Sequence, residues 1–447
     1  MKKSNSKKKE SNQAIVPLSR RKFITSTALT VGGISIVPRH VLGQGFIAPS
    51  DKINLGFIGL GKQTNGLARR FVDSTSAQIV AGCDVWTTKT AAFEKHVGKL
   101  YAKERKVKRY KGLTSYSDYK ELLSRKDIDA VVIATPDHWH AIQSIDAMHA
   151  GKDVYCEKPL THRITEGIDL VKTAEETEKI LQTGSMQRSG ENFRKACELV
   201  RNGYLGEIKK VLVNVGDPAI PYNMEEEPVP KELDWNSWCG PAPLLPYNHR
   251  LAPSRNDVDF WPDFRLFREV GGGILCDWGA HMFDIAQWAL GMDKTGPIRY
   301  IPPSDSTSVR GLRMYYANGI EMVHEDFGRG WGVRFIGSEG TMDISRSYFE
   351  ANPENILSAE LKDSDVRLYN TKGNHYQDWL DSIKNRTQPI CDAETGHRSA
   401  SICNIANIAY QLGHSLEWDP EKQQFKGDAE ANALRNRVNR DYSTLKS

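Results

Sequence analysis

The sequence has few cysteines and no closely spaced pair of them. Its 447 residues include seven cysteines, at positions 83, 156, 197, 239, 276, 391 and 403, and none belongs to a Cys-x-x-Cys motif. An odd number of widely spaced cysteines argues against a disulfide framework and against a cysteine-based zinc site. We therefore expect free thiols that are buried in the protein.

The sequence also lacks an apolar stretch of the roughly 20 residues that a membrane-spanning helix requires. The uncharged stretch 24–38 is shorter and is rich in Ser, Thr and Gly. It follows Ser19-Arg-Arg-Lys-Phe23, a twin-arginine pattern, and these features together predict that residues 1–43 are a signal peptide. We expect export by the twin-arginine route to the periplasm; the alternative is a basic tail without a targeting role.

Outside the N-terminus, acidic residues slightly outnumber basic ones. The chain carries a net charge of +4, yet residues 1–43 contain nine Lys or Arg and a single Glu, which leaves about −4 on the rest. Surfaces that bind nucleic acid are strongly basic, so this balance gives no support for a nucleic-acid partner. We expect a small molecule as the ligand.

From residue 53 onward, short apolar runs alternate with helical stretches. Runs that are apolar throughout, with helices between them, are typical of parallel strands that are covered on both faces. We therefore predict an α/β protein whose first domain, residues 50–184, contains a doubly wound parallel sheet. The expected strands lie at 53–58, 78–83, 129–134, 153–156 and 180–183.

The pattern changes after residue 205, where apolar and polar residues begin to alternate. Asn318-Gly319 lies between two alternating runs, which is typical of a β-hairpin. A Pro- and Trp-rich segment at 216–265 is too long for an ordinary connection and is expected to be functional. These features predict a second, α+β domain at 185–425, with an open, mostly antiparallel sheet, followed by a C-terminal tail at 426–447.

A dinucleotide site is indicated directly after the first strand. Gly59 and Gly61 follow the run 53–58, where a tight turn lets pyrophosphate approach a helix N-terminus, although Thr64 replaces the third glycine of the motif. Asp84 ends the second strand, where a carboxylate binds ribose hydroxyls and repels a 2′-phosphate. We therefore predict a Rossmann domain that binds NAD in preference to NADP. Further cofactor contacts are expected from Lys62, Gln63, Thr135, Pro136, His140, Glu157 and Lys158.

Two histidines, His138 and His140, follow the run 129–134 and resemble a pair of metal ligands. No cysteine or carboxylate at a suitable spacing completes a zinc site. We predict no metal, and a cofactor contact for His140 instead.

Lys158 and the segment that begins at Asp277 supply groups for proton transfer. Lys158 lies at a strand end, where a nearby nicotinamide cation would lower its pKa and allow proton exchange near neutral pH. Asp277, His281 and Asp284 share one face of a predicted helix. The alternatives are a solvated lysine, a helix-capping aspartate and a core histidine. Next to a nucleotide site, we interpret Lys158, Asp277 and His281 as catalytic.

The sequence resembles the Gfo/Idh/MocA oxidoreductases across residues 50–447. Glu157-Lys-Pro159 matches the Glu-Lys-Pro signature of that family, and Asp277 and His281 match its catalytic pair. Thr135-Pro-Asp137 stands where the family commonly has Thr-Pro-Asn. The resemblance implies hydride transfer between a nicotinamide and a secondary alcohol carbon of a sugar or cyclitol. It also implies a homo-oligomer formed through the sheet of the second domain.

Aromatic and basic residues concentrate in the segment 216–265. Aromatic rings stack on the apolar faces of sugars, and polar neighbours bind the hydroxyl groups. A hydrophobic cluster under a loop is the alternative. The predicted substrate residues are Tyr247, His249, Arg250, Trp261 and Arg265, together with Asp284.

Two other functions fit the same residues. A glycosidase or lyase would use bound NAD transiently, without a net change in its redox state. A non-catalytic sugar-binding protein would keep the fold, but it would have no need for Lys158, Asp277 and His281 together.

The cofactor prediction is testable on purified protein. We expect denatured protein to release NAD or NADH, because a protein exported in the folded state must acquire its cofactor beforehand. Asp84→Ala should weaken NAD binding and narrow the preference for NAD over NADP, since the carboxylate binds ribose hydroxyls. Mass spectrometry of the released nucleotide and titration with both cofactors measure these effects. Equal affinity of the parent protein for NAD and NADP would contradict the role of Asp84.

Overall fold

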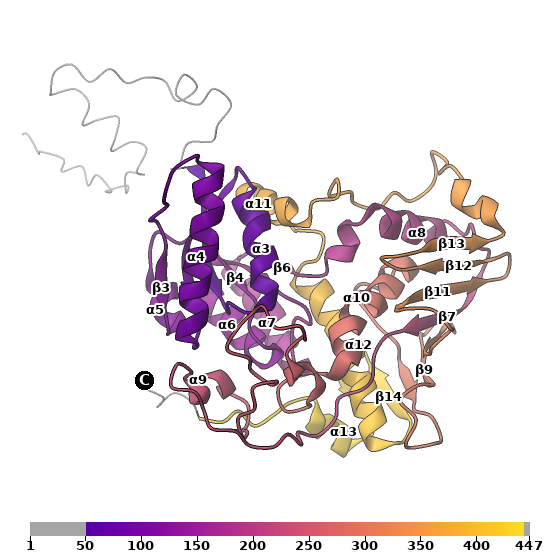
Figure 1. Cartoon of the computed structure of the whole chain (residues 1–447). Coiled ribbons are helices and arrows are strands. Elements are labelled where there is room, and N and C mark those ends of the chain that lie inside the picture. The colour runs from indigo at the N-terminus through magenta and orange to yellow at the C-terminus, as the bar shows by residue number, and fades with distance from the viewer. Residues whose placement is uncertain (1–50, 442–447) are drawn as a thin grey trace, which may run out of the picture. The chain divides into compact units, whose positions relative to one another are not determined.

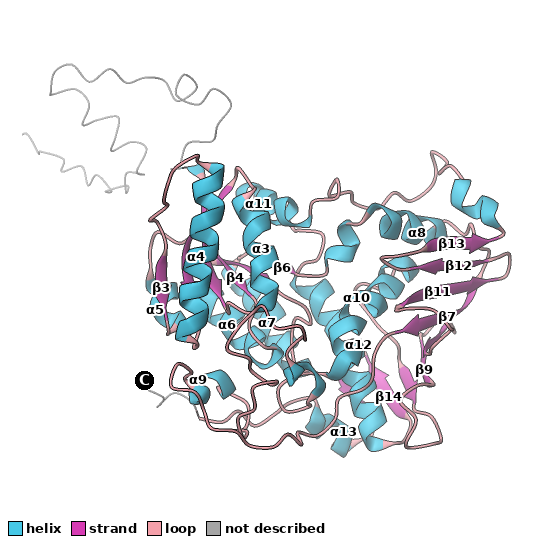
Figure 2. Cartoon of the chain, in the orientation of Figure 1, coloured by secondary structure: helices cyan, strands magenta, loops and turns pink. Residues whose placement is uncertain are grey.

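The structure, a computed structural model, describes residues 51–441. The predicted signal peptide, residues 1–43, and residues 442–447 lie outside the described residues. Two sheets and the helices that flank them form the described part of the chain (Figures 1 and 2).

The first sheet has six parallel strands in the order β3-β2-β1-β4-β5-β6, which is the doubly wound order of dinucleotide-binding domains. All four residues of β4 are buried, as expected for a strand with helices on both faces. β3 escaped prediction because Thr-Ser-Tyr is short and largely exposed. The strands are β1 (Ile53–Ile58), β2 (Ala77–Cys83), β3 (Thr114–Tyr116), β4 (Ala130–Ile133), β5 (Asp153–Cys156) and β6 (Leu181–Thr183), and the helices are α3 (Lys62–Val72), α4 (Thr87–Glu104), α5 (Tyr119–Ser124), α6 (Asp137–His149) and α7 (Ile164–Thr177).

The second sheet has nine strands in the order β13-β12-β11-β7-β10-β9-β8-β14-β15. Its pairs are antiparallel except for β7 and β10, and the predicted hairpin at Asn318-Gly319 joins β9 to β10. The α/β class and the mostly antiparallel second sheet are thus confirmed. The strands are β7 (Ile208–Asn214), β8 (Arg299–Ile301), β9 (Leu312–Tyr315), β10 (Glu321–His324), β11 (Gly332–Gly337), β12 (Thr341–Ile344), β13 (Phe349–Asn352), β14 (Leu416–Asp419) and β15 (Gln424–Phe425).

Helices α10 and α12 connect the two sheets. α10 is buried along most of its length and packs on β7 and β11, while α12 contacts both α10 and α7 of the first sheet. Glycines close both helices with left-handed C-caps, Gly291 after α10 and Gly413 after α12. The remaining helices are α8 (Glu191–Arg201), α9 (Trp235–Cys239), α10 (Gly273–Leu290), α11 (His375–Asn385), α12 (Ala393–Leu412) and α13 (Ala429–Leu434), with 3₁₀ turns η2 (Met186–Ser189), η3 (Asp263–Leu266) and η4 (Glu354–Ser358).

Two segments that follow most of the second sheet in the sequence pack against the first sheet and its helices. Trp379 of α11 packs in the first core, with its ring centroid 5.6 Å from those of Phe71 and Tyr155. Near the C-terminus, Arg437 forms an ion pair with Glu166 of α7, with 2.9 Å between the charged atoms. The first sheet and its helices are therefore contacted by two segments that come late in the sequence, one before β14 and one after β15.

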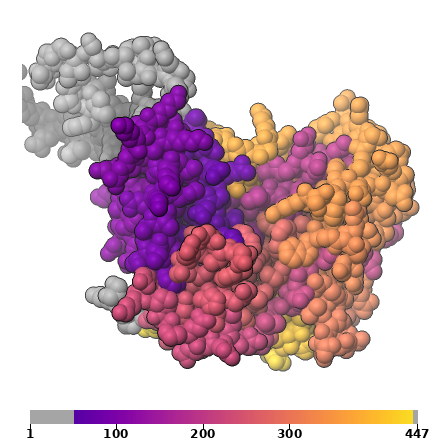
Figure 3. Space-filling view, viewed as in Figure 1, coloured from indigo at the N-terminus to yellow at the C-terminus, as the bar shows by residue number. Residues whose placement is uncertain are grey.

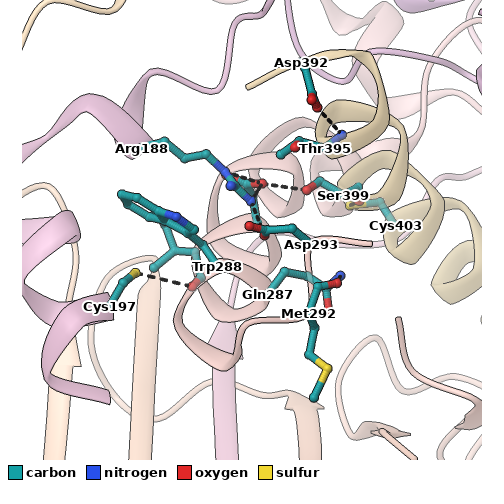
Figure 4. A network of polar contacts seen from close by, with 12 residues as sticks. Arg188, Cys197, Gln287, Trp288, Met292, Asp293, Asp392, Thr395, Ser399 and Cys403 are labelled. Atoms are coloured by element: carbon teal, nitrogen blue, oxygen red, sulfur yellow. Dashed lines mark hydrogen bonds and ion pairs between the residues drawn. The ribbon is translucent and has the colours of Figure 1, made fainter. Parts of the chain in front are cut away.

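A buried ion pair joins η2 to α10. The guanidinium group of Arg188 donates to both carboxylate oxygens of Asp284 at 2.8–3.0 Å, and Ser399 of α12 donates to the same carboxylate at 2.6 Å. Arg188 also pairs with Asp293 and lies 5.3 Å from the ring centroid of Trp288 (Figure 4). This network fixes α10 against its neighbours. All seven cysteines are buried and free, which confirms that prediction.

The Arg188–Asp284 pair should be essential for stability. Asp284→Ala leaves a buried guanidinium group without its main partner, and breaking such a pair costs about 3–5 kcal/mol. We expect a large fall in the urea concentration at the unfolding midpoint. Asp257→Ala is the matched control, because its partner Arg255 and Asp257 itself are both largely exposed and exposed pairs contribute little. Equal effects of the two substitutions would contradict this assignment.

Candidate functional site

A large cavity brings the predicted cofactor and catalytic residues together. Its volume is 1220 Å³, and its walls come from the first sheet, from the segment 216–265 and from α10. The carboxyl ends of β1, β4 and β5 supply three of the lining segments, the position where open α/β sheets bind ligands.

The glycine turn after β1 has the shape of a dinucleotide site. Gly59 has φ +83°, and a Cβ atom there would lie 2.6 Å from the backbone nitrogen of Thr135, so no other residue fits. A Cβ on Gly61, which caps α3, would meet no protein atom within 4 Å. Thr64 is buried and donates from its hydroxyl to the Gly59 carbonyl oxygen at 2.6 Å. The residue that breaks the glycine motif therefore closes the turn with a hydrogen bond.

Asp84 ties the end of β2 to this turn. One carboxylate oxygen accepts a hydrogen bond from the backbone N–H of Leu60 at 2.7 Å, and the other accepts one from the backbone N–H of Trp86 at 2.9 Å. The side chain lines the cavity, and each carboxylate oxygen keeps a further lone pair for a ligand hydroxyl group. Glycine turn and carboxylate thus fit NAD, whose ribose would lie at Asp84.

His140 connects two loops at the cavity wall. Its ring nitrogens lie 2.8 Å from the carbonyl oxygens of Thr135 and Pro159. Burial lowers the pKa of His140, but Cys156 and these carbonyl oxygens outweigh burial and raise it to about 9. A charged ring donates to both carbonyl groups. The imidazole therefore positions the loops after β4 and β5 instead of offering a nitrogen to the cofactor.

Hydrogen bonds hold the segment 216–265 against the glycine turn. Lys62 donates to the carbonyl oxygens of Val258 and Phe260 at 2.8 and 3.0 Å, and Asn256 donates to Leu60 at 2.7 Å. In Figure 3 this segment, in rose, lies against the indigo N-terminal part of the described chain. Lys62 therefore holds the wall of the cofactor site, in addition to lining the cavity.

The catalytic candidates meet in this cavity. Lys158 donates to the carboxylate of Asp277 at 2.5 Å and to the Asp277 carbonyl oxygen at 2.9 Å. Arg265 forms an ion pair with the other carboxylate oxygen. Burial alone would raise the pKa of Asp277, but the two cations outweigh it and hold this pKa below its ordinary value. Asp277 is therefore a carboxylate at neutral pH and orients both cations.

His281 lies one turn further along α10 and is 4% exposed. Burial, followed by the positive charges of Lys158 and Arg346, lowers its pKa well below the ordinary value. Among the described residues its Nδ1 atom has no hydrogen-bond partner. The ring is therefore neutral at pH 7 and able to accept a hydrogen bond or a proton.

Gln63, Glu157, Thr135 and Pro136, from which cofactor contacts are expected, also line the cavity. Gln63 donates to the carboxyl group of Glu157 at 3.1 Å, which joins α3 to the loop after β5. Burial raises the pKa of Glu157, and Lys158 opposes this shift.

The structure brings two of the six predicted substrate residues to the cavity and not the other four. Trp261 and Arg265 line it. Tyr247 packs on Trp235 with ring centroids 5.2 Å apart, in the hydrophobic cluster that was the alternative interpretation. His249 and Arg250 bind the neighbouring carboxylates of Glu227 and Asp263 at 2.7 and 2.6 Å, and Asp284 is fully buried with Arg188. The prediction for these four residues is corrected.

Three cavity residues gave no signal in the sequence. Trp278 packs on Trp331 with ring centroids 4.6 Å apart, and Arg346 lies 4.6 Å from the Trp278 centroid. Trp331 precedes β11 and Arg346 follows β12, so strand connections bring them to the site. Trp278 stands beside Asp277 in the motif, but helical periodicity assigned it to another face.

A fourth unpredicted candidate is Asp137, a buried carboxyl group that lines the cavity.

No three His, Cys, Asp or Glu residues within 51–441 form a group that could hold a metal ion. None of the helices described there is long and apolar enough to span a bilayer.

Two family models match the chain. One, described as an oxidoreductase family with an NAD-binding Rossmann fold, matches residues 53–185, and the C-terminal alpha/beta domain of the same family matches residues 212–445. The chain therefore belongs to the Gfo/Idh/MocA oxidoreductases, which confirms the resemblance and the NAD cofactor.

Individual relatives are similar over part or most of the chain. A glycosyl hydrolase family 109 protein from Shewanella sp. (strain ANA-3) is 33% identical over 186 residues, which are 40% of this chain and 39% of that protein. The myo-inositol 2-dehydrogenase from Lactobacillus plantarum has a TM-score of 0.54 at 19% identity, and the aldose-aldose oxidoreductase from Caulobacter crescentus has 0.56 at 18%. Both structural matches cover 82% of this chain and 99% of the other, and they show a shared fold.

The two glycines of the turn should respond differently to alanine. Gly59→Ala forces a Cβ into the backbone of residue 135 at a positive φ, so we expect lower thermal stability and lost NAD binding. Gly61→Ala meets no protein atom, so we expect an unchanged melting temperature without nucleotide but weaker NAD binding. Thermal unfolding and nucleotide titration separate these outcomes. Unimpaired NAD binding by Gly61→Ala would show that the cofactor does not approach this glycine.

Proposed function

We propose that this oxidoreductase transfers hydride between NAD and a secondary alcohol carbon of a sugar or glycoside. The observation that carries the proposal is the charged group of Lys158, Asp277 and Arg265, next to a neutral His281, in the same cavity as the glycine turn. This arrangement supplies a hydrogen-bond donor and a proton acceptor beside the expected nicotinamide.

Each of these residues would have its own role in alcohol oxidation. Bound NAD supplies the hydride acceptor. The ammonium group of Lys158 would bind the substrate oxygen and stabilise the negative charge that develops there as the proton leaves. Asp277 orients Lys158 through two hydrogen bonds, and the neutral imidazole of His281 would accept a hydrogen bond from the hydroxyl group.

Several side chains of the cavity wall suit a carbohydrate. Trp261, Trp278 and Trp331 offer rings to the apolar faces of a sugar, and Arg265 and Arg346 offer donors to its hydroxyl groups. The names of two structural relatives, an inositol dehydrogenase and an aldose-aldose oxidoreductase, support this substrate class.

A second candidate is the cleavage of a glycoside without net oxidation. It is favoured by the similarity to a glycosyl hydrolase family 109 protein, although the chain spans only 39% of that relative's length. The 1220 Å³ cavity leaves room for an aglycone beside the sugar. Glycoside cleavage with no accumulation of NADH would identify this reaction.

Two further proposals concern the cell and the assembly. We propose export by the twin-arginine route, on the basis of Arg20 and Arg21, with the periplasm as the destination. We also propose a homo-oligomer formed through the nine-stranded sheet, one part of which carries Arg329, Arg334, Asp343 and Glu350 in linked ion pairs.

Both reactions can be tested with purified protein and a panel of sugars and glycosides, followed at the NADH absorbance and by product analysis. Lys158→Ala and His281→Ala should each lower turnover by roughly 10²–10⁴-fold, the usual contribution of a positioned acid or base, and leave NAD binding intact. If His281→Ala kept parental turnover and lost only thermal stability, the histidine would be a core residue.

The substrate side has a matched pair of variants. Trp261→Ala should raise the KM for the sugar more than it weakens NAD binding, because the ring lines the cavity. His249→Ala should leave KM unchanged, since that side chain is 59% exposed and paired with Glu227 outside the cavity. Similar KM values for both variants would remove Trp261 from the substrate site.

A further inference from the structure

Asp137 is a carboxyl group of the cavity that the roles above leave unassigned. It begins α6, directly after the loop at the end of β4, and its side chain lines the cavity while only 6% exposed. The charges that act on it belong to Asp277 of α10, Lys158 after β5 and Arg265 of η3. Within residues 51–441, it forms no ion pair or hydrogen bond with another side chain.

Two other groups of the cavity, Asp277 and His281, are unfavourable positions for an additional proton at neutral pH. Asp277 uses both oxygens in ion pairs, and its pKa lies below the ordinary value. Lys158 already donates to both the carboxylate and the carbonyl oxygen of Asp277. Burial and the positive charges of Lys158 and Arg346 hold the pKa of His281 well below its ordinary value, so its imidazole does not retain a proton. A proton released by a substrate hydroxyl group therefore has no lasting position on Asp277 or His281.

We propose that Asp137 is the proton acceptor of the cavity, on whose carboxylate the proton of the substrate hydroxyl group comes to rest. The proposal depends on the proposed function. In the oxidation direction the O–H bond breaks, and its electron pair forms the C=O bond as hydride leaves the carbon for NAD. The proton moves to a carboxylate oxygen of Asp137, which lines the same cavity as Lys158 and His281. In reduction the same carboxyl group returns it.

The electrostatic surroundings of Asp137 support this assignment. Burial raises its pKa, the charge of Asp277 raises it further, and Lys158 and Arg265 oppose the shift, with a result of about 7. Both protonation states are therefore populated at neutral pH, which is the condition for efficient proton exchange. The Thr-Pro-Asn that is common in this family places an amide here, and an amide cannot take up the proton.

Glu157 is the competing candidate, because it is also a buried carboxyl group of the cavity with a raised pKa. Its carboxyl group accepts a hydrogen bond from Gln63, and a Cβ on Gly184 would lie 3.0 Å from it. Glu157 therefore interacts with a residue that is expected to contact the cofactor. Asp137 instead experiences the charges of Asp277 and Arg265, where the substrate is expected to bind.

Asp137→Asn tests the proposal, since the amide has nearly the same size and cannot accept the proton. For the parent protein we expect kcat/KM of sugar oxidation to fall about tenfold per pH unit below the pKa near 7. Asp137→Asn should lack this acidic limb and have roughly 100-fold lower turnover, within the range for a lost acid or base, with NAD binding retained. Glu157→Gln should keep the acidic limb, whatever its effect on NAD affinity.

Thermal unfolding in the absence of substrate supplies an independent readout. The pKa of Asp137 is higher in the folded protein, about 7, than its ordinary value of 3.8, so the folded state binds the proton more tightly. This contribution to stability is complete below pH 4 and is lost as the pH rises to 7. The melting temperature of Asp137→Asn relative to the parent should therefore increase by roughly 3–6 °C between pH 4 and pH 8.

An acidic limb that persists in Asp137→Asn, or one that disappears in Glu157→Gln, would overturn the proposal. A melting-temperature difference that is constant with pH would do so as well, because the carboxyl group would then not titrate in this range. If the parent protein oxidises no sugar while the pH-dependent difference is present, the proposed function is wrong although the ionisation of Asp137 is right.

Discussion

The carboxylate of Asp277 is the interaction on which the site depends. It binds Lys158 from the loop after β5 and Arg265 from η3, while the residue itself belongs to the first turns of α10. All three side chains are largely removed from water, so each charge would be costly without its partner. Three segments that are far apart in the sequence therefore have one favourable arrangement, and it places Lys158 and His281 at the same cavity.

A second attachment fixes the segment 216–265 at the cofactor end. Lys62 and Asn256 bind across the glycine turn, and Arg265 forms an ion pair with Asp277. The segment thus contacts the residues expected to hold NAD and also those expected to act on the substrate. This arrangement holds the wall of the cofactor site against the glycine turn at one point and against the catalytic group at another.

The sequence predicted the features that depend on local pattern. Apolar runs identified the buried parallel strands, Asn318-Gly319 identified a hairpin, and Gly59, Gly61 and Asp84 identified the nucleotide site. Tyr247 shows where such reasoning ends, because an aromatic-rich segment has the same composition whether its rings face a cavity or one another. Trp331 and Arg346 depend on the pairing of strands in the second sheet, which no short pattern determines.

Asp284 illustrates a more specific limit. Helical periodicity correctly places it on the face of Asp277, but two turns along the helix are a displacement of about 10 Å, far enough to leave the cavity. Arg188, about a hundred positions earlier in the chain, occupies that depth and pairs with it. Spacing within a helix gives the direction of a side chain, and the partner that decides its role comes from elsewhere.

Asp137 presents the opposite situation, in which a change of a few atoms alters the chemistry and leaves the shape intact. An amide at this position would fill the same volume and carry no charge. Burial and the negative charge of Asp277 both disfavour the ionised form of a carboxyl group at this position, so its pKa is raised to about 7. Two neighbouring groups are fixed in one protonation state, Asp277 as a carboxylate by its two ion pairs and His281 as a neutral ring by burial among positive charges. A site with fixed charges can orient a substrate and stabilise its oxygen, but it needs one group whose charge can change in order to complete the transfer of a proton.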